Sequence, residues 1–160
     1  MLFLARDPNS LENDFSTVLL SAVVKDKIES ASPRIESKGV EILIIENGEP
    51  TVFTSSAILS AVFGNLLRNA VIHSDSKDIH IEIFSHGFSI KDFGRGIETE
   101  LMDKMFKRYT NGNADSSNGN GIGLSLVKRL CDHFKWQLVV ESGMKIGTTI
   151  TVNFQDSIRN

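Results

Sequence analysis

The sequence has one cysteine, no surplus of positive charge and no long apolar run. Cys131 has no second cysteine to pair with, so an internal disulfide is excluded, and no zinc-ligand spacing is present. The formal net charge of −3 argues against a general nucleic-acid binder, although an acidic protein can still bind an anion at a locally positive site. No apolar stretch reaches the roughly 18 to 20 residues that span a bilayer. These absences favour a domain in a reducing cytoplasm.

Length and composition fit one globular domain. The chain has 160 residues, of which 41% are hydrophobic and 23% charged, as is usual for a protein with a single core. Residues 1–5 are apolar, but Arg6 and Asp7 follow at once, which is unlike a signal peptide and like the end of a helix that began earlier. We therefore expect a helix tail and linker over residues 1–13, a domain over residues 14–156 and a disordered tail over residues 157–160.

Hydrophobic periodicity predicts alternating helices and strands. In order, these are a helix from residue 16 to about residue 28, strands over 40–46 and 51–53, a helix from about residue 56 to 71, strands over 79–84 and 88–90, a short helix over 99–105, a polar loop over 110–121, a helix over 121–133, and strands over 136–140 and 148–154. The end of the first helix stays open because Pro33 lies in the polar stretch that follows. Asn47-Gly48 is typical of a hairpin turn, and Ser55 or Ser56 is a suitable N-cap. The strands over 79–84 and 88–90 are expected to form a hairpin that turns at His86-Gly87.

The predicted order of elements indicates a fold class. Strands joined by tight turns cannot be parallel neighbours, so hairpins imply antiparallel pairing. We expect an α+β two-layer sandwich, in which a mixed or antiparallel sheet is covered on one face by about three helices.

Asn65, Asn69 and His73 are spaced by four residues, so they lie on one stripe of a predicted helix. Asparagine is a mediocre helix former, and two of them in an otherwise apolar helix need a reason. One reason is a polar edge that faces solvent. The other is an amide oxygen that coordinates a hard cation such as Mg²⁺.

A second motif, D-F-G-R-G-I, begins at Asp92 directly after a strand. Its glycines, Gly94 and Gly96, allow the backbone to approach a ligand closely. A carboxylate held there can accept a hydrogen bond from an exocyclic amine such as that of adenine. An ordinary Asp/Gly turn, running on to Ile97, has the same composition.

A third motif, G-N-G-I-G-L, lies where the polar loop becomes a helix and contains Gly119, Gly121, Ile122, Gly123 and Leu124. Free backbone N–H groups and the positive end of the helix dipole favour phosphate binding there. A flexible glycine hinge is the alternative. The motif is not a dinucleotide fingerprint, because no βαβ unit surrounds it.

Two further signals are weaker. Phe106 could anchor the base of the polar loop while Arg108 contacts a phosphate, or the two could be a core phenylalanine beside a solvated cation. Lys107 fits the solvated alternative better. Thr148 could hydrogen-bond the Asp92 carboxylate, or it could only reflect the preference of threonine for strands.

The order of these motifs is more specific than any one of them. Asn-x-x-x-Asn, Asp-x-Gly-x-Gly, a phenylalanine box, a glycine-rich lid, Gly-x-Gly-x-Gly-Leu and Gly-Thr follow one another. This order resembles the ATP-binding catalytic domain of bacterial sensor histidine kinases. That domain has the Bergerat fold, with a flexible ATP lid, which is shared with gyrase, mismatch-repair ATPases and heat-shock chaperones. The resemblance covers about residues 14–155.

The resemblance implies a role for each site residue. Asn69 would coordinate Mg²⁺ at the phosphates of ATP, with Asn65 near the same ion, and Asp92 would bind the adenine amine. The other residues implied to contact or shape the nucleotide site are His73, Gly94, Gly96, Ile97, Phe106, Arg108, Gly119, Gly121, Ile122, Gly123, Leu124 and Thr148.

Three positions distinguish this chain within the resemblance. ATP-hydrolysing relatives commonly have a glutamate where this chain has Asn65, and an amide cannot take a proton from water. Weak hydrolysis and phosphoryl transfer by positioning and charge stabilisation are therefore expected. Ile72 replaces a common lysine and Asn111 a common arginine, so two phosphate contacts of many such kinases are missing.

The resemblance also implies partners. None of the histidines (His73, His80, His86 and His133) has the acidic neighbour and following proline of a phosphoacceptor. The acceptor would lie on a dimerisation/phosphoacceptor domain, whose last helix residues 1–5 resemble, for relay to a response-regulator aspartate. The chain would be a monomer without nucleic-acid or direct membrane contact, from the cytoplasmic part of an inner-membrane sensor kinase.

Two other functions remain open from the sequence. An anti-sigma-type serine kinase, a partner-binding regulator, has the same nucleotide fold, but its kinase members commonly keep an acidic residue at position 65. A degenerate nucleotide-binding or structural module is suggested by Ile72 and Asn111. The presence of Asp92, Asn69 and the three lid glycines argues against it.

Overall fold

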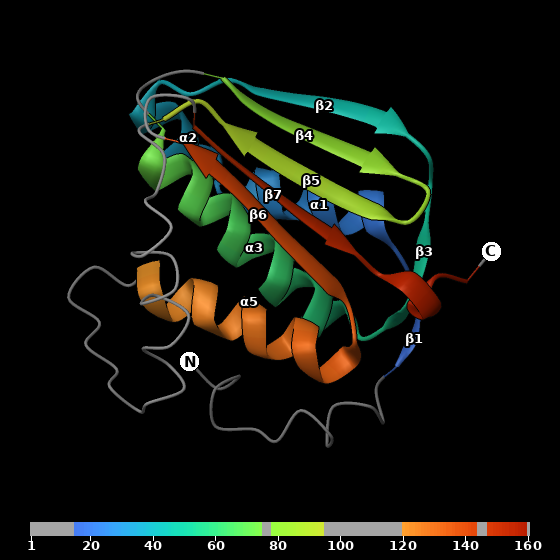
Figure 1. The fold of residues 1–160 in the computed structure, drawn as a ribbon. Coiled ribbons are helices and arrows are strands. Elements are labelled where there is room, and N and C mark those ends of the chain that lie inside the picture. The colour runs from blue at the N-terminus through green and yellow to red at the C-terminus, as the bar shows by residue number, and fades with distance from the viewer. Residues whose placement is uncertain (1–14, 75–77, 95–119, 144–146, 160) are drawn as a thin grey trace.

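The computed structural model describes residues 15–74, 78–94, 120–143 and 147–159. In chain order the elements are β1 (Ser16–Leu19), α1 (Leu20–Ser30), α2 (Ser32–Lys38), β2 (Ile42–Asn47), β3 (Thr51–Thr54), α3 (Ser56–His73), β4 (Ile79–Phe84), β5 (Gly87–Asp92), α5 (Asn120–Phe134), β6 (Gln137–Gly143), β7 (Gly147–Asn153) and a short 3₁₀ helix (Gln155–Ser157). Helices α1, α3 and α5 lie on one face of a twisted sheet (Figure 1). Within these residues, no helix combines the length and the apolar character needed to cross a membrane.

The main sheet has five strands in the order β2-β4-β5-β7-β6. β2 runs parallel to β4, and the other neighbouring strands are antiparallel. The predicted hairpin of β4 and β5 is confirmed, and its two strands pair from Ile79 opposite Asp92 to Phe84 opposite Gly87. A mixed sheet with helices on one face confirms the predicted two-layer α+β sandwich.

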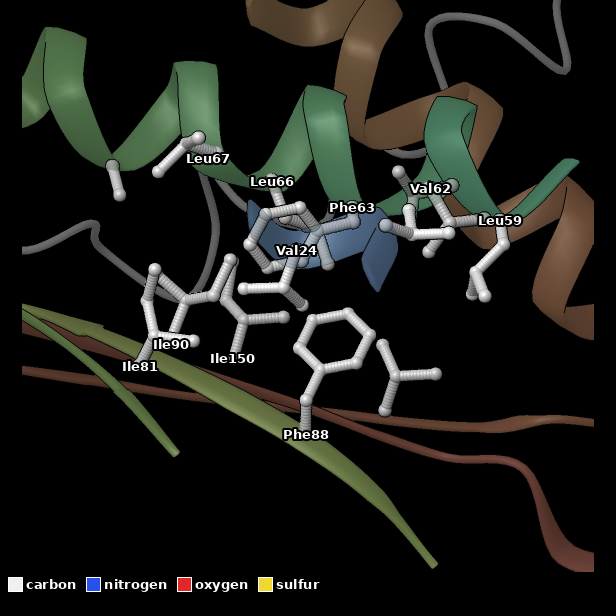
Figure 2. Close-up of a cluster of buried hydrophobic side chains, with 14 of the residues drawn as sticks. Val24, Leu59, Val62, Phe63, Leu66, Leu67, Ile81, Phe88, Ile90 and Ile150 are labelled. Atoms are coloured by element: carbon white, nitrogen blue, oxygen red, sulfur yellow. The ribbon is translucent and has the colours of Figure 1, made fainter. Parts of the chain in front are cut away.

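The core lies between α3 and the middle of this sheet. Figure 2 shows Phe63 and Leu66 of α3 pointing toward Phe88 and Ile90 of β5. The rings of Phe63 and Phe88 meet edge to face, with centroids 5.2 Å apart. Both side chains are fully buried. Burial of such side chains is the main favourable term in folding, so α3 is held in place by its apolar face.

The start of α3 has a good sequence signal, and the structure confirms it. Ser55 is the N-cap, and its Oγ accepts a hydrogen bond of 3.0 Å from the backbone N–H of Ile58. This bond satisfies one of the backbone donors that a helix start leaves without partners. The helix then continues for 18 residues to His73, which brings the predicted polar stripe to its C-terminal half.

The predicted first helix is wrong at its start. Ser16–Leu19 is strand β1, which pairs antiparallel with β3, and α1 begins only at Leu20. Apolar neighbours such as Val18 and Leu19 fit a helical or a strand period when the run is short. Pairing with β3, which lies more than 30 residues later, decides for the strand.

The predicted hairpin at Asn47-Gly48 is also wrong. β2 pairs with β4 in the main sheet, whereas β3 leaves that sheet and pairs with β1. Gly48 instead allows a close backbone approach, because a Cβ there would come within 2.9 Å of the Ser85 nitrogen in the β4–β5 turn. The turn-like dipeptide therefore serves a tertiary contact.

Pro33 starts a helix rather than ending one. It lies in the first turn of α2, where proline is favoured because its missing N–H has no helical partner anyway. Gly39 ends the helix in the left-handed conformation, with φ of 74°. Helix α2 has no clear signal in the sequence because the segment is polar except for Ile35.

The predicted disordered tail is attached to the fold over its described part. Ile158 forms a bridge with Val52, and the Arg159 N–H donates to the carbonyl of Thr51 at 2.8 Å. The Arg159 guanidinium also lies over the ring of Phe53, 5.3 Å from its centre. These contacts extend the small β1–β3 sheet. The predicted helix over 99–105 and the loop over 110–119 lie outside the described residues.

Candidate functional site

Four of the predicted site residues that the structure describes meet at one end of the fold. Asp92 is the last residue of β5, and Thr148 lies opposite it near the start of β7. His73 is the last residue of α3. Gly94 connects these parts, because a Cβ at this position would overlap the His73 carbonyl oxygen. The C-terminal end of α3 therefore lies directly against the segment that follows β5.

Asp92 is a buried carboxylate with only 5% of its surface exposed. The backbone N–H of Gly94 donates to its Oδ1 at 3.0 Å. A buried carboxylate needs such bonds, because burial without them is very unfavourable. Thr148 is buried beside it, and its Oγ1 is 2.8 Å from the Ser142 Oγ of β6. The Asp92 carboxylate is thus oriented at the C-terminal end of the central strand β5.

Two glycines allow the backbone to close around Asp92. The first is Gly94, packed on His73 as described above. The second is Gly147, with φ of 104°, where a Cβ would overlap the Asp92 carbonyl oxygen. Only glycine adopts such a conformation without strain and leaves room for the neighbouring strand.

Asn69 is the most unusual polar group at this end of the molecule. It is 6% exposed, and its Oδ1 is buried without a hydrogen-bond partner among the described residues. Buried polar atoms are nearly always satisfied, so an amide oxygen left without a partner indicates a ligand, an ion or a water. An amide oxygen is also a suitable ligand for Mg²⁺. The side chain therefore fits the metal that the motif implies.

Asn65 lies one turn earlier on the same stripe and is half-buried. Its Nδ2 donates to the Ala61 carbonyl at 2.6 Å, which orients the amide. The described residues contain no cluster of three or more His, Cys, Asp or Glu side chains that could hold a metal. The amide oxygens of Asn65 and Asn69 are the described side-chain groups on this stripe that could hold a metal.

Helix α5 supplies the glycine motif of the site. It begins at Asn120, so Gly121 and Gly123 lie in its first turn. In Figure 1 it runs beside α3, with its first residues next to the C-terminal half of α3. Leu124, at the end of the motif, is buried and joins the core. The N-terminus of α5 is thus near the stripe of α3 that carries Asn69.

A match to a known family agrees with this arrangement. The family model for histidine kinase-, DNA gyrase B- and HSP90-like ATPases matches residues 54–158. The chain belongs to this family. The sensor protein BceS of Halalkalibacterium halodurans is 33% identical over 153 residues, which cover 90% of this chain and 45% of that protein. The autoinducer 2 sensor kinase/phosphatase LuxQ of Vibrio parahaemolyticus is 33% identical over 136 residues, with 75% and 16% coverage. The chain spans less than half the length of these relatives.

Solved structures show the same fold. A mycobacterial sensor histidine kinase, MprB, superposes with a TM-score of 0.72 at 22% identity, over 86% of this chain and 95% of that chain. The catalytic domain of histidine kinase ThkA superposes with a TM-score of 0.71 at 19% identity, over 86% and 93%. The resemblance that the motif order predicted, to the ATP-binding domain of sensor histidine kinases, is confirmed.

Part of the predicted site lies outside the described residues. These positions are Gly96, Ile97, Phe106, Arg108 and Gly119. For Gly121, Ile122 and Gly123 the structure describes the helical backbone of α5. Their implied roles stay predictions.

Some residues that build this end were not predicted. The Lys38 Nζ of α2 donates to the Ile72 carbonyl at 3.1 Å, which places a cation at the C-terminal end of α3. Such a cation is favourable there because the helix dipole is negative at that end. Ser142 bonds Thr148 from the neighbouring strand. No local pattern indicates either contact. Lys38 and Ile72 are far apart in the sequence, and Ser142 meets Thr148 only because β6 and β7 pair in the sheet.

Proposed function

We propose that this chain binds Mg²⁺ and ATP at the end of α3 and transfers the γ-phosphate to a histidine of a separate phosphoacceptor domain. The observation that carries this proposal is a pair of buried polar groups at the same end of the fold. Asp92 is a buried, oriented carboxylate, and Asn69 has a buried amide oxygen without a hydrogen-bond partner in the part of the chain that the structure describes. The family supports ATP as the ligand.

The adenine end of the site would be Asp92 and its neighbours. The Gly94 N–H occupies Oδ1, and the carboxylate can accept another bond from an exocyclic amine. His73 lies beside this position because its carbonyl contacts Gly94. Thr148 would support the carboxylate from β7. Gly96 and Ile97 would complete the pocket.

The phosphate end would lie between α3 and the N-terminus of α5. The N–H groups at the start of α5, around Gly121 and Gly123, would bind phosphate oxygens. Asn69 would hold Mg²⁺, with Asn65 nearby, and the bound ion would neutralise charge on the phosphates. The lid residues that we expect to contribute further contacts are Phe106, Arg108, Gly119, Ile122 and Leu124.

The absence of an acid at position 65 favours a kinase over an ATPase. The Asn65 amide cannot accept a proton from water, and its Nδ2 is already bonded to Ala61. The chain would therefore position ATP for attack by an imidazole from elsewhere, with little hydrolysis. The dimerisation/phosphoacceptor domain of the same kinase would supply that imidazole. A response regulator would then receive the phosphoryl group, in the cytoplasm.

Calorimetric titration with a non-hydrolysable ATP analogue tests the site. We expect saturable binding that Asp92→Asn abolishes, because the amide presents a donor where the adenine amine needs an acceptor. Asn69→Ala should remove the dependence of binding on Mg²⁺. Asp78→Asn, a change at an exposed aspartate, is the matched control and should bind normally. A folded wild-type chain that binds no nucleotide would contradict the proposal.

Transfer is tested separately with labelled ATP and a histidine-containing dimerisation domain added in trans. We expect label on that domain and none on the chain alone. Label on a serine of a partner protein would favour the anti-sigma type of kinase instead.

A further inference from the structure

A groove of about 630 Å³ lies between α1, α2 and α3. Its lining includes Lys27, Arg34, Ala61, Gly64, Asn65 and Arg68. Asn65 is shared with the proposed nucleotide site, so the groove begins where that site ends. The groove has a cationic character in a chain whose formal net charge is −3.

Two of these cations converge on one turn of α3. A Cβ at Gly64 would lie 2.8 Å from the Lys27 Cε and 3.5 Å from its Nζ, so the lysine crosses α3 over the glycine. Arg68 lies one turn later on the same face, and helical side chains lean toward the N-terminus. The Arg68 side chain therefore covers the turn that contains Gly64 and Asn65.

Neither cation is neutralised within the part of the chain that is described. The ion pairs there join Lys25 to Glu46 and Lys128 to Asp132. Neither Lys27 nor Arg68 forms an ion pair with a carboxylate among the described residues. The two cations lie on the neighbouring helices α1 and α3. Two cations brought together without an anion form a local site for one.

In the proposed site a nucleotide would lie with its terminal phosphate toward the groove. The adenine position, at Asp92 and His73, is at the C-terminal end of α3. Asn69 and then Asn65 follow toward the N-terminus, and each step of four helical residues is about 6 Å. The phosphate farthest from adenine would therefore lie nearest Asn65 and the groove. Ile72 provides no cation on this face.

We propose that Lys27 and Arg68 bind the terminal phosphate of a nucleoside triphosphate and so distinguish it from the diphosphate. This inference rests on the proposed function and adds two residues to it. Arg68 can form a paired hydrogen bond with phosphate oxygens, and Lys27 adds a point charge. After transfer the diphosphate product lacks the group that these cations hold, which favours its release.

The experiment measures the dissociation constants of ADP and of a non-hydrolysable ATP analogue, both with Mg²⁺, for the wild type and for Lys27→Gln and Arg68→Gln. We expect each substitution to weaken binding of the analogue about tenfold, the size typical of a charge-assisted bond, and to leave ADP binding unchanged. Lys25→Gln removes a cation from the same helix outside the groove and is the matched control. It should change neither constant.

Gly64→Ala provides an independent variant that keeps every charge. Its methyl group would displace the Lys27 side chain, while alanine is a better helix former than glycine, so the fold is retained. We expect the same selective loss of analogue binding, to a smaller extent.

Each other outcome overturns the inference in its own way. Equal weakening of ADP and analogue binding would mean that the cations act only through the general field of the site. Unchanged constants in Lys27→Gln and Arg68→Gln would mean that the groove does not contact the nucleotide, while the proposed function would stand. A wild-type chain that binds neither ligand would overturn the proposed function and this inference with it.

Discussion

The middle of α3 and its C-terminal end differ in how well their buried groups are satisfied. In the middle, Phe63 and its neighbours pack against β5 with apolar atoms only (Figure 2). Toward the end, the Asp92 carboxylate and the Asn69 amide are both buried, and the Asn69 oxygen has no hydrogen-bond partner among residues 15–74, 78–94, 120–143 and 147–159. The comparison shows that one helix can stabilise the fold with one part and bind a ligand with another. Local departures from good packing are expected where function requires them.

Removing a core side chain from the middle of α3 should have the largest effect on stability. Phe63→Ala removes a fully buried ring from the contact with Phe88 and is expected to lower the free energy of unfolding by about 3–5 kcal/mol. Chemical denaturation measures this change. Leu43→Ala, at a side chain that is 50% exposed, should stay within about 0.5 kcal/mol of the wild type. Equal losses for both variants would contradict this account of the core.

Filling the space between Gly94 and the end of α3 should affect nucleotide binding as well as stability. Gly94→Ala places a methyl group on the His73 carbonyl, so α3 and the segment after β5 must move apart. Overpacking of this kind typically costs about 1–3 kcal/mol, and we expect nucleotide binding to be lost in the folded variant. Circular dichroism and calorimetry would report fold and binding separately. The control is Gly39→Asn, at a helix end where nothing lies within 4 Å of the added Cβ and asparagine tolerates the left-handed conformation.

The core should also impose a pH dependence through Cys131. Burial raises the pKa of this thiol from its ordinary value of 9.0 to about 12, and the nearby Asp132 adds to the rise. Above pH 9 the unfolded thiol loses its proton while the folded one keeps it, so stability falls as pH rises. A loss of about 1.4 kcal/mol is expected between pH 8 and pH 10 from this group.

Comparing the pH dependence of denaturation of Cys131→Ala with that of the wild type isolates the contribution of the thiol. The variant has a cavity and is less stable at every pH, but its stability should decline less across this range. Parallel declines in the two proteins would show that the thiol does not contribute.

Replacing Asn69, whose buried oxygen has no partner among the described residues, should stabilise the chain and abolish its Mg²⁺-dependent binding of nucleotide. Asn69→Leu replaces an amide whose buried oxygen has no partner in the described part of the chain by an apolar group of similar size, which is expected to raise the free energy of unfolding by about 1 kcal/mol without nucleotide. Mg²⁺-dependent binding should be lost at the same time. Asn65→Leu is the comparison, because that amide already bonds Ala61 and gives no such gain. A destabilised Asn69→Leu protein would mean that the amide is satisfied in the folded chain.

Sequence patterns predicted the structure correctly where the signal was local and long. Ser55 and the apolar face of α3 predicted that helix, and the β4–β5 hairpin followed from its alternation. Asp92 and Asn69 were selected from separate motifs, and the structure brings them to the same end of the fold.

Sequence patterns predicted the wrong structure where a short segment took its conformation from a distant partner. Leu19 belongs to a strand only because β3 is beside it, and Asn47-Gly48 makes no hairpin because β2 has β4 as its partner. Pro33 was ambiguous because proline both ends and starts helices.

The amino-acid sequence by itself determined the family, the two-layer class and the residues with site chemistry, because the order of short motifs and their periodicity are local properties. The tertiary structure alone decided that β2 lies parallel to β4, that Gly94 and Gly147 close around Asp92, and that Lys27 crosses α3 over Gly64. These are contacts between segments far apart in the chain. Their formation depends on the burial of a shared core, which no local pattern contains.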